Sequence, residues 1–367
     1  MGVSKEPGWA RAREVIMAKD KQQTKSVIKT IAVYLAVIAA LMFVLVPAAL
    51  IWESQSALDR HHLTQVGAMI MLWKHGEQET FGSHRRGTLN WVGDLPDLTL
   101  TPAAASILGK SHRRTLHLPL RHLSPEVAKG LSHSDNLNLT DLESVSPEAL
   151  KELMSGHSDW SSFHSLRIPN MTRAHAEALA GYKGQLTLYG NPQLSAEAAQ
   201  GLSQIEATRL LLHDLKQLSR GTAEALSRCR VGHLQIGFSG NIYDLWENTF
   251  ESISGETAEA LTQSQSRSLS IGPFETISGS TAAALCQYPS SIWLRVKHIP
   301  DEAAMWLAQI PGSLWITGLE HLSDAGAHAL AGKENLVIYT YRSTGPHALP
   351  TLPASAAAIL ESRIQQQ

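Results

Sequence analysis

Four residues in the C-terminal part of the chain have the types and spacing of a recognition surface: Trp293, Arg295, Trp315 and Tyr339. Trp293 and Trp315 each stand between two aliphatic residues, in Ile-Trp-Leu and Leu-Trp-Ile, and lie 22 positions apart. Such alternation is typical of a β-strand, whose successive side chains point to opposite faces. Because tryptophan, tyrosine and arginine dominate binding hot spots, the chemistry that this pattern predicts is non-covalent binding.

The sequence carries none of the common catalytic signatures. Neither G-x-S-x-G, the P-loop pattern, the dinucleotide-binding pattern G-x-G-x-x-G nor the zinc pattern H-E-x-x-H occurs. The segment Gly237–Gly240 (Gly-Phe-Ser-Gly) comes nearest to a nucleophile turn, but its spacing is wrong and we interpret it as a loop. We therefore expect a protein that is not an enzyme and needs no cofactor.

Histidine is frequent, and two of its 17 copies have the spacing to share a metal ion. His298 and His321 directly precede Ile299 and Leu322, which occupy equivalent positions in two neighbouring repeats. Equivalent residues of adjacent strands lie about 4.8 Å apart, which suits two imidazoles on one metal. The next repeat has Thr351 at this position, and no third ligand is evident. We predict solvated histidines and no metal site, with metal binding by the pair as the alternative.

The elements that must position these residues are copies of one repeating unit. Each unit has an apolar anchor, and a leucine, here called the closing leucine, stands eight positions after every anchor. The anchors are Leu100, Leu123, Val145, Met171, Leu194, Leu218, Ile253, Ile277, Ile299, Leu322 and Leu352. The closing leucines are Leu108, Leu131, Leu153, Leu179, Leu202, Leu226, Leu261, Leu285, Leu307, Leu330 and Leu360.

Each unit predicts a strand, a tight turn and a capped helix. An apolar alternation such as Leu116-x-Leu118 comes before the anchor and indicates the strand. Ser or Thr follows the anchor in nine units and proline in two, and a hydroxyl there can cap a helix. Alanine stands five positions after the anchor in every unit except one, which has Leu150. Anchors spaced mostly 22 to 26 residues apart indicate a solenoid, in which each unit buries its apolar face against its neighbours.

The segment Leu319–Gly326 and the closing Leu330 resemble the leucine-rich repeats, in the cysteine-containing, ribonuclease-inhibitor-like variant that reads L-x-L-x-x-C-x-x-L-T-D-x-G-L-x-x-L-A. Leu319 stands where that variant carries Cys or Asn. The resemblance covers roughly residues 88–360 and is strongest to bacterial envelope repeat proteins. It implies an α/β solenoid with a curved parallel sheet, outer helices and a role in binding, but it names no ligand.

In such a fold, the middle residue of each Leu-x-Leu and the residue after the second leucine face away from the core, onto the concave side of the sheet. We therefore predict a ligand-binding face that is polar in its N-terminal half and aromatic in its C-terminal half. Its members are His117, Asn138, Arg167, Trp293, Arg295, Trp315 and Tyr339. An insertion at residues 237–251 adds a candidate binding loop with Tyr243 and Trp246. Alternatively, these two side chains cover the aromatic residues.

Residues 30–52 form an uncharged apolar run, long enough for the roughly 20 residues that a bilayer core requires. Seven Lys or Arg precede it in a basic tail of residues 1–29, whereas Arg60 is the only Lys or Arg in residues 53–72. This asymmetry predicts a single-pass signal-anchor helix with a cytoplasmic N-terminus and a periplasmic or otherwise extracytoplasmic C-terminal domain. A cleaved signal peptide is the alternative, but its apolar region usually spans only about 7–15 residues.

The charge of the chain is unevenly distributed. Seven Lys or Arg against three Asp or Glu give residues 1–29 a charge of +4, so a formal net charge of −2 leaves −6 on the remaining residues. A mildly acidic body argues against nucleic acid as a partner, because phosphate contacts need a basic face. Cys229 and Cys286 belong to units too far apart for a disulfide, so both are expected to be free thiols.

The chain is therefore predicted to contain five parts. These are a cytoplasmic tail (1–29), a transmembrane helix (30–52), a juxtamembrane linker and N-terminal cap (53–87), about 11 repeat units (88–360) and a polar tail (361–367). The cap is expected to be a helix that runs into a first strand, within the amphipathic to apolar segment Ala57–Trp73. We expect a membrane-anchored, non-catalytic binding or scaffold protein whose partner is a protein or another envelope ligand. A receptor for a glycan or another small envelope ligand on the Trp/Arg platform is the alternative.

Overall fold

The computed structural model describes residues 62–63, 88–90, 98–110, 115–156, 162–237, 250, 252–340, 354–361 and 364–366. The chain forms two compact units, Met1–Arg60 and His61–Gln367, and all of these residues belong to the second. The predicted basic tail, the predicted transmembrane segment (30–52) and most of the predicted cap lie outside the described residues. Within the described ranges, no helix is long and apolar enough to cross a membrane.

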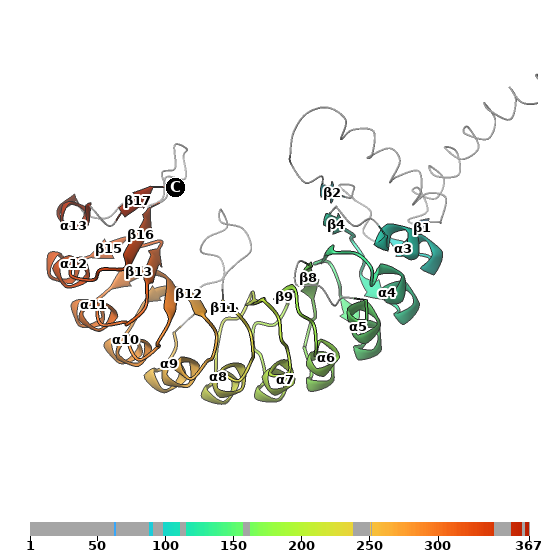
Figure 1. Cartoon of the computed structure of the whole chain (residues 1–367), viewed down its shortest axis with the longest axis horizontal. Coiled ribbons are helices and arrows are strands. Elements are labelled where there is room, and N and C mark those ends of the chain that lie inside the picture. The colour runs from blue at the N-terminus through green and yellow to red at the C-terminus, as the bar shows by residue number, and fades with distance from the viewer. Residues whose placement is uncertain are drawn as a thin grey trace, which may run out of the picture. The chain divides into compact units, whose positions relative to one another are not determined.

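Parallel strands and helices alternate throughout the second unit, which confirms the predicted α/β class (Figure 1). The strands of the main sheet are β2 (Thr88–Asn90), β4 (Thr115–His117), β6 (Asn136–Leu139), β8 (Phe163–Arg167), β9 (Gln185–Tyr189), β10 (Arg209–Leu212), β11 (His233–Ile236), β12 (Ser268–Thr276), β13 (Ser291–Ile299), β14 (Leu314–Thr317), β16 (Leu336–Thr340) and β17 (Ile364–Gln366). They pair in sequence order, each parallel to the next. This order is compatible with a solenoid, because each repeat then contacts only its neighbours.

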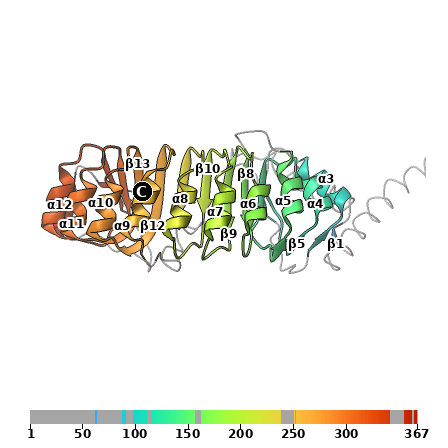
Figure 2. The same cartoon turned by 90° about the horizontal axis from the view of Figure 1, so that it is seen from below.

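The helices form a second layer on one side of the sheet. They are α3 (Pro102–Gly109), α4 (Pro125–Leu131), α5 (Pro147–Met154), α6 (Arg173–Ala178), α7 (Ala196–Leu202), α8 (Arg220–Leu226), α9 (Gly255–Thr262), α10 (Gly279–Leu285), α11 (Asp301–Leu307), α12 (Asp324–Ala331) and α13 (Ala354–Ile359). Figure 2 shows α3 to α12 side by side in sequence order, and each helix packs against those of the adjoining units. In Figure 1 the strands lie on the inner side of this two-layered unit and the helices on its outer side.

The closing leucines lie in the core between the two layers. All of them, from Leu108 in α3 to Leu360 after α13, are fully buried, as the repeat frame predicts. The apolar strand residues, such as Leu116 and Leu118, are fully buried too. Fully burying a leucine side chain stabilises a fold by about 1.5–3 kcal/mol, so the repetition of this contact contributes strongly to the stability of the array.

Nine helices begin with the capping residue that the sequence predicts. In each, the Ser or Thr after the anchor accepts a hydrogen bond from the backbone N–H three residues later, as Ser219 does from Thr222 at 3.1 Å. Helix α11 follows Pro300 instead and has no side-chain cap, but Asp301 and Glu302 lie in its first turn. Their negative charge is favourable beside the positive end of the helix dipole. The start of each of these helices is thereby fixed to its repeat position.

The anchors also pair with one another, in short ladders beside the main sheet. Strand β5 (His122–Leu123) is parallel to β7 (Ser144–Val145), and β15 (His321–Leu322) is parallel to the end of β13. Leu123 thus lies opposite Val145, and Leu322 opposite Ile299. These short ladders keep neighbouring repeat units in register just before their helices begin.

The first correction to the predicted organisation concerns the N-terminal cap. His62 and Leu63 form strand β1 instead of part of a helix, and they pair in parallel with β3 (Thr99–Leu100). Leu63 is therefore an additional anchor, and Ala68 and Met71 stand five and eight positions after it. The repeat frame does not include this unit because methionine replaces the closing leucine.

A second correction concerns the C-terminal tail, which the sequence predicts as a polar extension. Its residues Ile364–Gln366 form β17, which pairs with β16 and places Ile364 opposite Ile338. A glutamine-rich segment can do this because the backbone supplies the hydrogen bonds of the ladder.

A third correction concerns the register of one strand. The repeat frame aligns Leu166 with Leu186, the first leucine of the next strand. In the structure Leu166 instead pairs with Leu188, and His164 takes the first position opposite Leu186. The imidazole of His164 is fully buried, 5.3 Å from the ring of Tyr182. A search for apolar alternation cannot find this position, because a polar side chain occupies an apolar site.

Candidate ligand-binding face

The side of the main sheet that faces away from the helices is here called the inner face. Alternate strand residues point to it, and the parallel register arranges them in rows that cross the sheet. The first row is Thr115, Asn136, Phe163, Gln185, Arg209, His233, Ser268 and Ser291. The second row is His117, Asn138, Ser165, Thr187, Leu211, Gln235, Ser270, Trp293, Trp315 and Val337. The third row includes Arg167, Tyr189, His213, Arg295, Thr317 and Tyr339.

Three aromatic residues of these rows form a cluster, here called the aromatic stack: Trp293, Trp315 and Tyr339. Trp293 and Trp315 lie opposite each other on β13 and β14, and their ring centroids are 4.7 Å apart with planes at 15°. The ring of Tyr339 is stacked with that of Trp293 at 6.0 Å and 14°. All three residues are half-buried. Each ring therefore gives at least one of its faces to another ring, while part of the stack remains open to solvent.

Arg295 lies on the same face, two residues beyond Trp293 on β13 and opposite Thr317. Only 5% of this residue is exposed. A partner on the surface therefore cannot reach Arg295 unless its neighbours move. The structure thus places Arg295 next to the aromatic stack as the sequence predicts, but as a buried neighbour of the stack instead of an exposed cation.

The polar N-terminal half of the predicted face is also assembled by the register. His117 on β4 lies opposite Asn138 on β6, and the Nε2 atom of His117 is 3.5 Å from a carboxylate oxygen of Asp141. Nε2 of His117 and Oδ1 of Asn138 are buried atoms without a hydrogen bond. Because of the register of β8, Ser165 lies next to Asn138, and Arg167 lies in the third row beside Tyr189.

The centre of the inner face contains a pair of rings that the sequence does not single out. Tyr189 and His213 are stacked with centroids 4.7 Å apart and planes at 22°. Burial lowers the pKa of His213 to about 4, although the neighbouring Asp214 acts in the opposite direction. Burial, with a smaller contribution from Asp214, raises the pKa of Tyr189. Thr187 is close to fully buried, and its hydroxyl, like Nδ1 of His213, makes no hydrogen bond.

The first row is the part of the face that sequence reasoning missed. Except for Phe163, which precedes His164, its residues stand one position before the first apolar residue of each strand, so extending the alternation backwards by one residue would have found them. Arg209 is exposed and donates to Oε1 of Gln185 at 3.4 Å. His233 lies between Ser268 and Ser270, each of which is hydrogen-bonded to one of its ring nitrogens. Burial and the adjacent Arg209 lower the pKa of His233 to about 4.

The structure brings the predicted residues together in two groups. One group is His117, Asn138 and Arg167 on β4, β6 and β8. The other is Trp293, Arg295, Trp315 and Tyr339 on β13, β14 and β16, with β9 to β12 between the groups. Tyr243 and Trp246, the predicted binding loop, lie outside the described residues. The exposed rings of His298 and His321 are 5.8 Å apart at 69°. In the described part of the chain, no group of three or more His, Cys, Asp or Glu is arranged to hold a metal ion.

The helix side of the unit offers a contrast to the inner face. An open groove of about 670 Å³ is lined there by Arg173, Glu177, Arg228, Arg230 and their neighbours. Arg173 and Glu177 form an ion pair at 2.6 Å, one helical turn apart. Charges of both signs on exposed helices are typical of a solvated surface, and such pairs contribute little free energy.

Comparison with models of known protein families finds no match, and no curated protein matches the chain either. The function therefore has to be inferred from the inner face itself.

Proposed function

We propose that this protein is a membrane-anchored, non-catalytic binding or scaffold protein of the leucine-rich-repeat type, which holds a protein partner on its inner face outside the cytoplasm. The observation that carries this proposal is the aromatic stack, in which three nearly parallel rings remain half-exposed on a rigid sheet. Exposed aromatic clusters are costly in water and become favourable when a partner covers them.

The repeat assignment rests on the agreement between sequence and core. The eleven closing leucines, which the leucine-rich-repeat pattern requires, are all buried, and the Ser or Thr of that pattern caps nine helices. The membrane anchor rests on the uncharged run at residues 30–52 and the basic tail that precedes it. An anchor would keep the inner face close to the membrane and so raise its effective concentration toward partners there.

The geometry of the aromatic stack favours a protein over a glycan as the partner. A sugar ring stacks on the open face of an indole, but here Trp293 and Trp315 are stacked on each other at 4.7 Å. What the cluster offers is therefore a compact apolar surface made largely of ring edges, which suits packing against protein side chains. A glycan or other small envelope ligand remains the second candidate, because part of each ring is open.

The test is capture by the purified full chain, immobilised in detergent, from solubilised envelope proteins. Replacing both Trp293 and Trp315 by alanine should weaken capture of the specific partner at least about 30-fold, since truncating one hot-spot aromatic typically costs about 2 kcal/mol. Partners should be quantified by mass spectrometry, with thermal melting to show that the variant folds. Trp306→Ala on α11 is the matched control, because Trp306 is 37% exposed and lies on the helix layer.

Undiminished capture by the folded Trp293→Ala/Trp315→Ala variant would place the site elsewhere and refute the proposal. The glycan alternative is tested in parallel with envelope glycan fractions. If those fractions bind in a Trp-dependent way and no protein does, the partner is a glycan.

A further inference from the structure

The inner face differs from the rest of the protein in its charge. None of the positions in its three rows is Asp or Glu, although the chain beyond residue 29 carries a net charge of −6. Asp141 and Asp214 come only after the strands end, and Glu275 lies beyond the third row, paired with Lys297 at 3.1 Å. The described rows of the inner face therefore contain no Asp or Glu, and Asp141 reaches the face only at its edge, 3.5 Å from His117.

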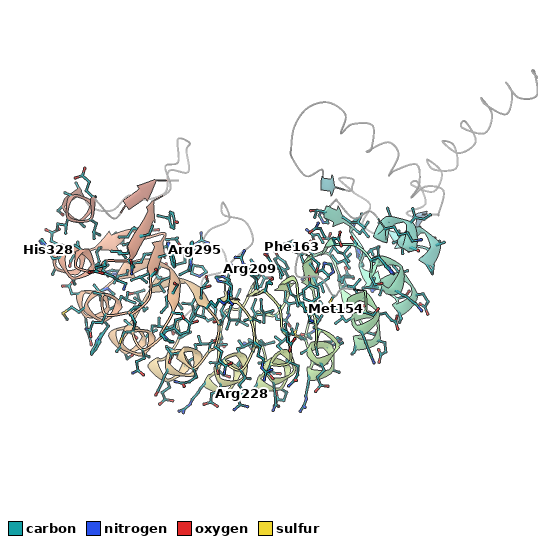
Figure 3. The ribbon with its side chains drawn as sticks, in the orientation of Figure 1. Met154, Phe163, Arg209, Arg228, Arg295 and His328 are labelled. Carbon is teal, nitrogen blue, oxygen red and sulfur yellow. The ribbon has the colours of Figure 1, made fainter. Side chains whose placement is uncertain are left out.

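Two arginines give this face exposed positive charge. Arg167 is in the third row on β8, and Arg209 is in the first row on β10. Both are exposed, and neither has a carboxylate within 4 Å among the described residues. Figure 3 shows Arg209 on the strand side of the unit and Arg228 on the outer, helix side.

On the helix layer, two arginines pair with glutamates of the chain, whereas Arg228 and Arg230 are exposed there. Arg173 pairs with Glu177, and Arg220 pairs with both Glu224 and Glu256. Glutamates recur there for a local reason, since Glu126, Glu148, Glu197, Glu256 and Glu302 all lie in the first turn of a helix, where the helix dipole favours negative charge. The fold thus supplies carboxylates to the starts of the helices, whereas no ion pair joins Arg167 or Arg209 to a described carboxylate.

Hydrogen-bonding groups on the same face are also unsatisfied. Oδ1 of Asn138, Oγ1 of Thr187 and Nδ1 of His213 are buried atoms without a hydrogen bond, and all three residues lie in the second or third row. A buried polar atom left without a partner is unfavourable. A polar segment laid along the face could supply these bonds, which a purely apolar partner could not.

We propose that the partner segment that binds this face is acidic, and that two of its carboxylates pair with Arg167 and Arg209 across β8 to β10. This inference rests on the proposed function, because it describes the partner protein that the inner face would hold. Arginine is suited to the role, since its planar fork can bind a carboxylate through two parallel hydrogen bonds.

The register sets the spacing of the two carboxylates. Arg167 and Arg209 are two strands apart and separated by four residues along the strand direction, which puts their Cα atoms roughly 16 Å apart. An extended segment rises about 3.3 Å per residue, so two acidic residues about five positions apart would match the two guanidinium groups. Thr187 and Leu211 lie between the arginines and carry no charge.

This pattern favours an acidic protein segment over a uniformly charged polymer such as a nucleic acid or a sulfated glycan. Polyanion binding requires many cations that follow a regular phosphate or sulfate spacing. Here two exposed arginines alternate with neutral and apolar residues, and His213 and His233 are uncharged at neutral pH because burial lowers the pKa of each to about 4. A protein segment that carries a few carboxylates among uncharged residues matches such a face better than a polyanion does.

The test uses the purified full chain in detergent and a fluorescein-labelled peptide of Gly and Ser with glutamates five positions apart. Fluorescence anisotropy should show binding that weakens with added salt, and the same peptide with Gln in place of Glu should bind at least about tenfold more weakly. The double variant Arg167→Glu/Arg209→Glu should lose a similar factor. Arg228→Glu/Arg230→Glu is the control, because it changes the net charge equally at two exposed arginines of the helix side.

Equal losses in the two double variants would overturn the proposal, because they would show a response to net charge alone. Equal binding of the Glu and Gln peptides would also overturn it. Tighter binding of heparin or of a single-stranded oligonucleotide than of the peptide, lost in the Arg167/Arg209 variant, would replace the acidic segment by a polyanion. If the Glu variants fail to fold, Arg167→Gln/Arg209→Gln answers the same question.

The two proposals fail separately in these experiments. Full capture by the Trp293/Trp315 variant would refute the proposed function whatever the peptide does. Loss of capture in that variant, together with no effect of the Arg167/Arg209 substitutions on peptide binding, would refute only the acidic segment.

Discussion

His213 and His233 show at the residue scale what the inner face does to a polar side chain. The imidazole of His213 is buried and that of His233 half-buried on the sheet, and this loss of solvent lowers the pKa of each to about 4. Both are therefore neutral at pH 7 and act as hydrogen-bonding groups without charge. His233 has serine partners at both ring nitrogens, whereas His213 is stacked on Tyr189 and leaves Nδ1 without a hydrogen bond.

Burial of His213 predicts a loss of stability in mild acid. Free histidine has a pKa of about 6.5, so between about pH 6.5 and pH 4 the unfolded chain binds a proton that the native His213 excludes. The free energy of unfolding should therefore be highest above about pH 6.5 and fall as the pH is lowered toward 4. This residue alone should contribute a loss of about 1–2 kcal/mol between pH 7 and pH 5.

The comparison that isolates this effect is His213→Phe, which keeps a ring against Tyr189 but cannot titrate. Melting temperatures of the full chain should be measured at pH 7 and pH 5. Between pH 7 and pH 5, the melting temperature should fall less in the variant than in the natural protein. An equal drop in both proteins would mean that His213 is not held neutral by the fold.

At the scale of the element, the repeat makes most of the architecture predictable. Every unit packs against its neighbours in the same way. Its closing leucine, its cap and its strand therefore recur at fixed spacing and can be recognised from the sequence. Elements that lack these residues cannot be recognised from the repeat pattern. His164 fills an apolar position, Met71 replaces a closing leucine, and Ile364 pairs as a strand from a tail rich in glutamine.

The candidate site is predictable to a lesser degree, because its properties arise between elements. The frame places Trp293 and Trp315 on neighbouring strands, and the structure pairs them. The sequence does not reveal that their rings stack on each other or that Arg295 is only 5% exposed, since both depend on how neighbouring side chains pack. It also does not predict Arg209 as a residue of the inner face, because the Leu-x-Leu pattern of that strand begins one residue later.

Helix α7 offers a direct test of the repeat frame. Ala199 stands five positions after its anchor and is fully buried, whereas the next residue, Gln200, is exposed. Ala199→Phe should overpack the contact between helix and sheet and reduce the free energy of unfolding by about 1–3 kcal/mol. Gln200→Ala should change it by less than about 0.5 kcal/mol. Thermal melting of both variants should separate them clearly, and similar melting temperatures would contradict the frame.

At the scale of the whole molecule, the same repeat separates two kinds of surface. The helix layer contains the N-termini of the helices, where glutamates are favourable because of the helix dipole. The sheet layer contains strand residues, and nothing in the repeat requires these to be acidic. A long inner face whose rows contain no Asp or Glu therefore arises from the architecture, even though the chain beyond residue 29 is acidic. The strands from β4 to β16 belong to one sheet (Figure 1), so the polar and the aromatic groups of residues lie on the same side of one sheet.

The last prediction concerns the side of the membrane on which this face lies. Residues 1–29 carry seven Lys or Arg, and the stretch after the apolar run contains only Arg60 up to residue 72. Cationic flanks are retained in the cytoplasm, so the repeat domain should lie outside it. Protease added to spheroplasts of a bacterium expressing the chain should degrade residues 53–367, while an epitope tag fused before residue 1 stays protected until the cells are lysed. A cytoplasmic marker protein controls for lysis. Protection of the whole chain in intact spheroplasts, with degradation only after lysis, would show that the inner face is cytoplasmic, and its partner would then have to be sought there.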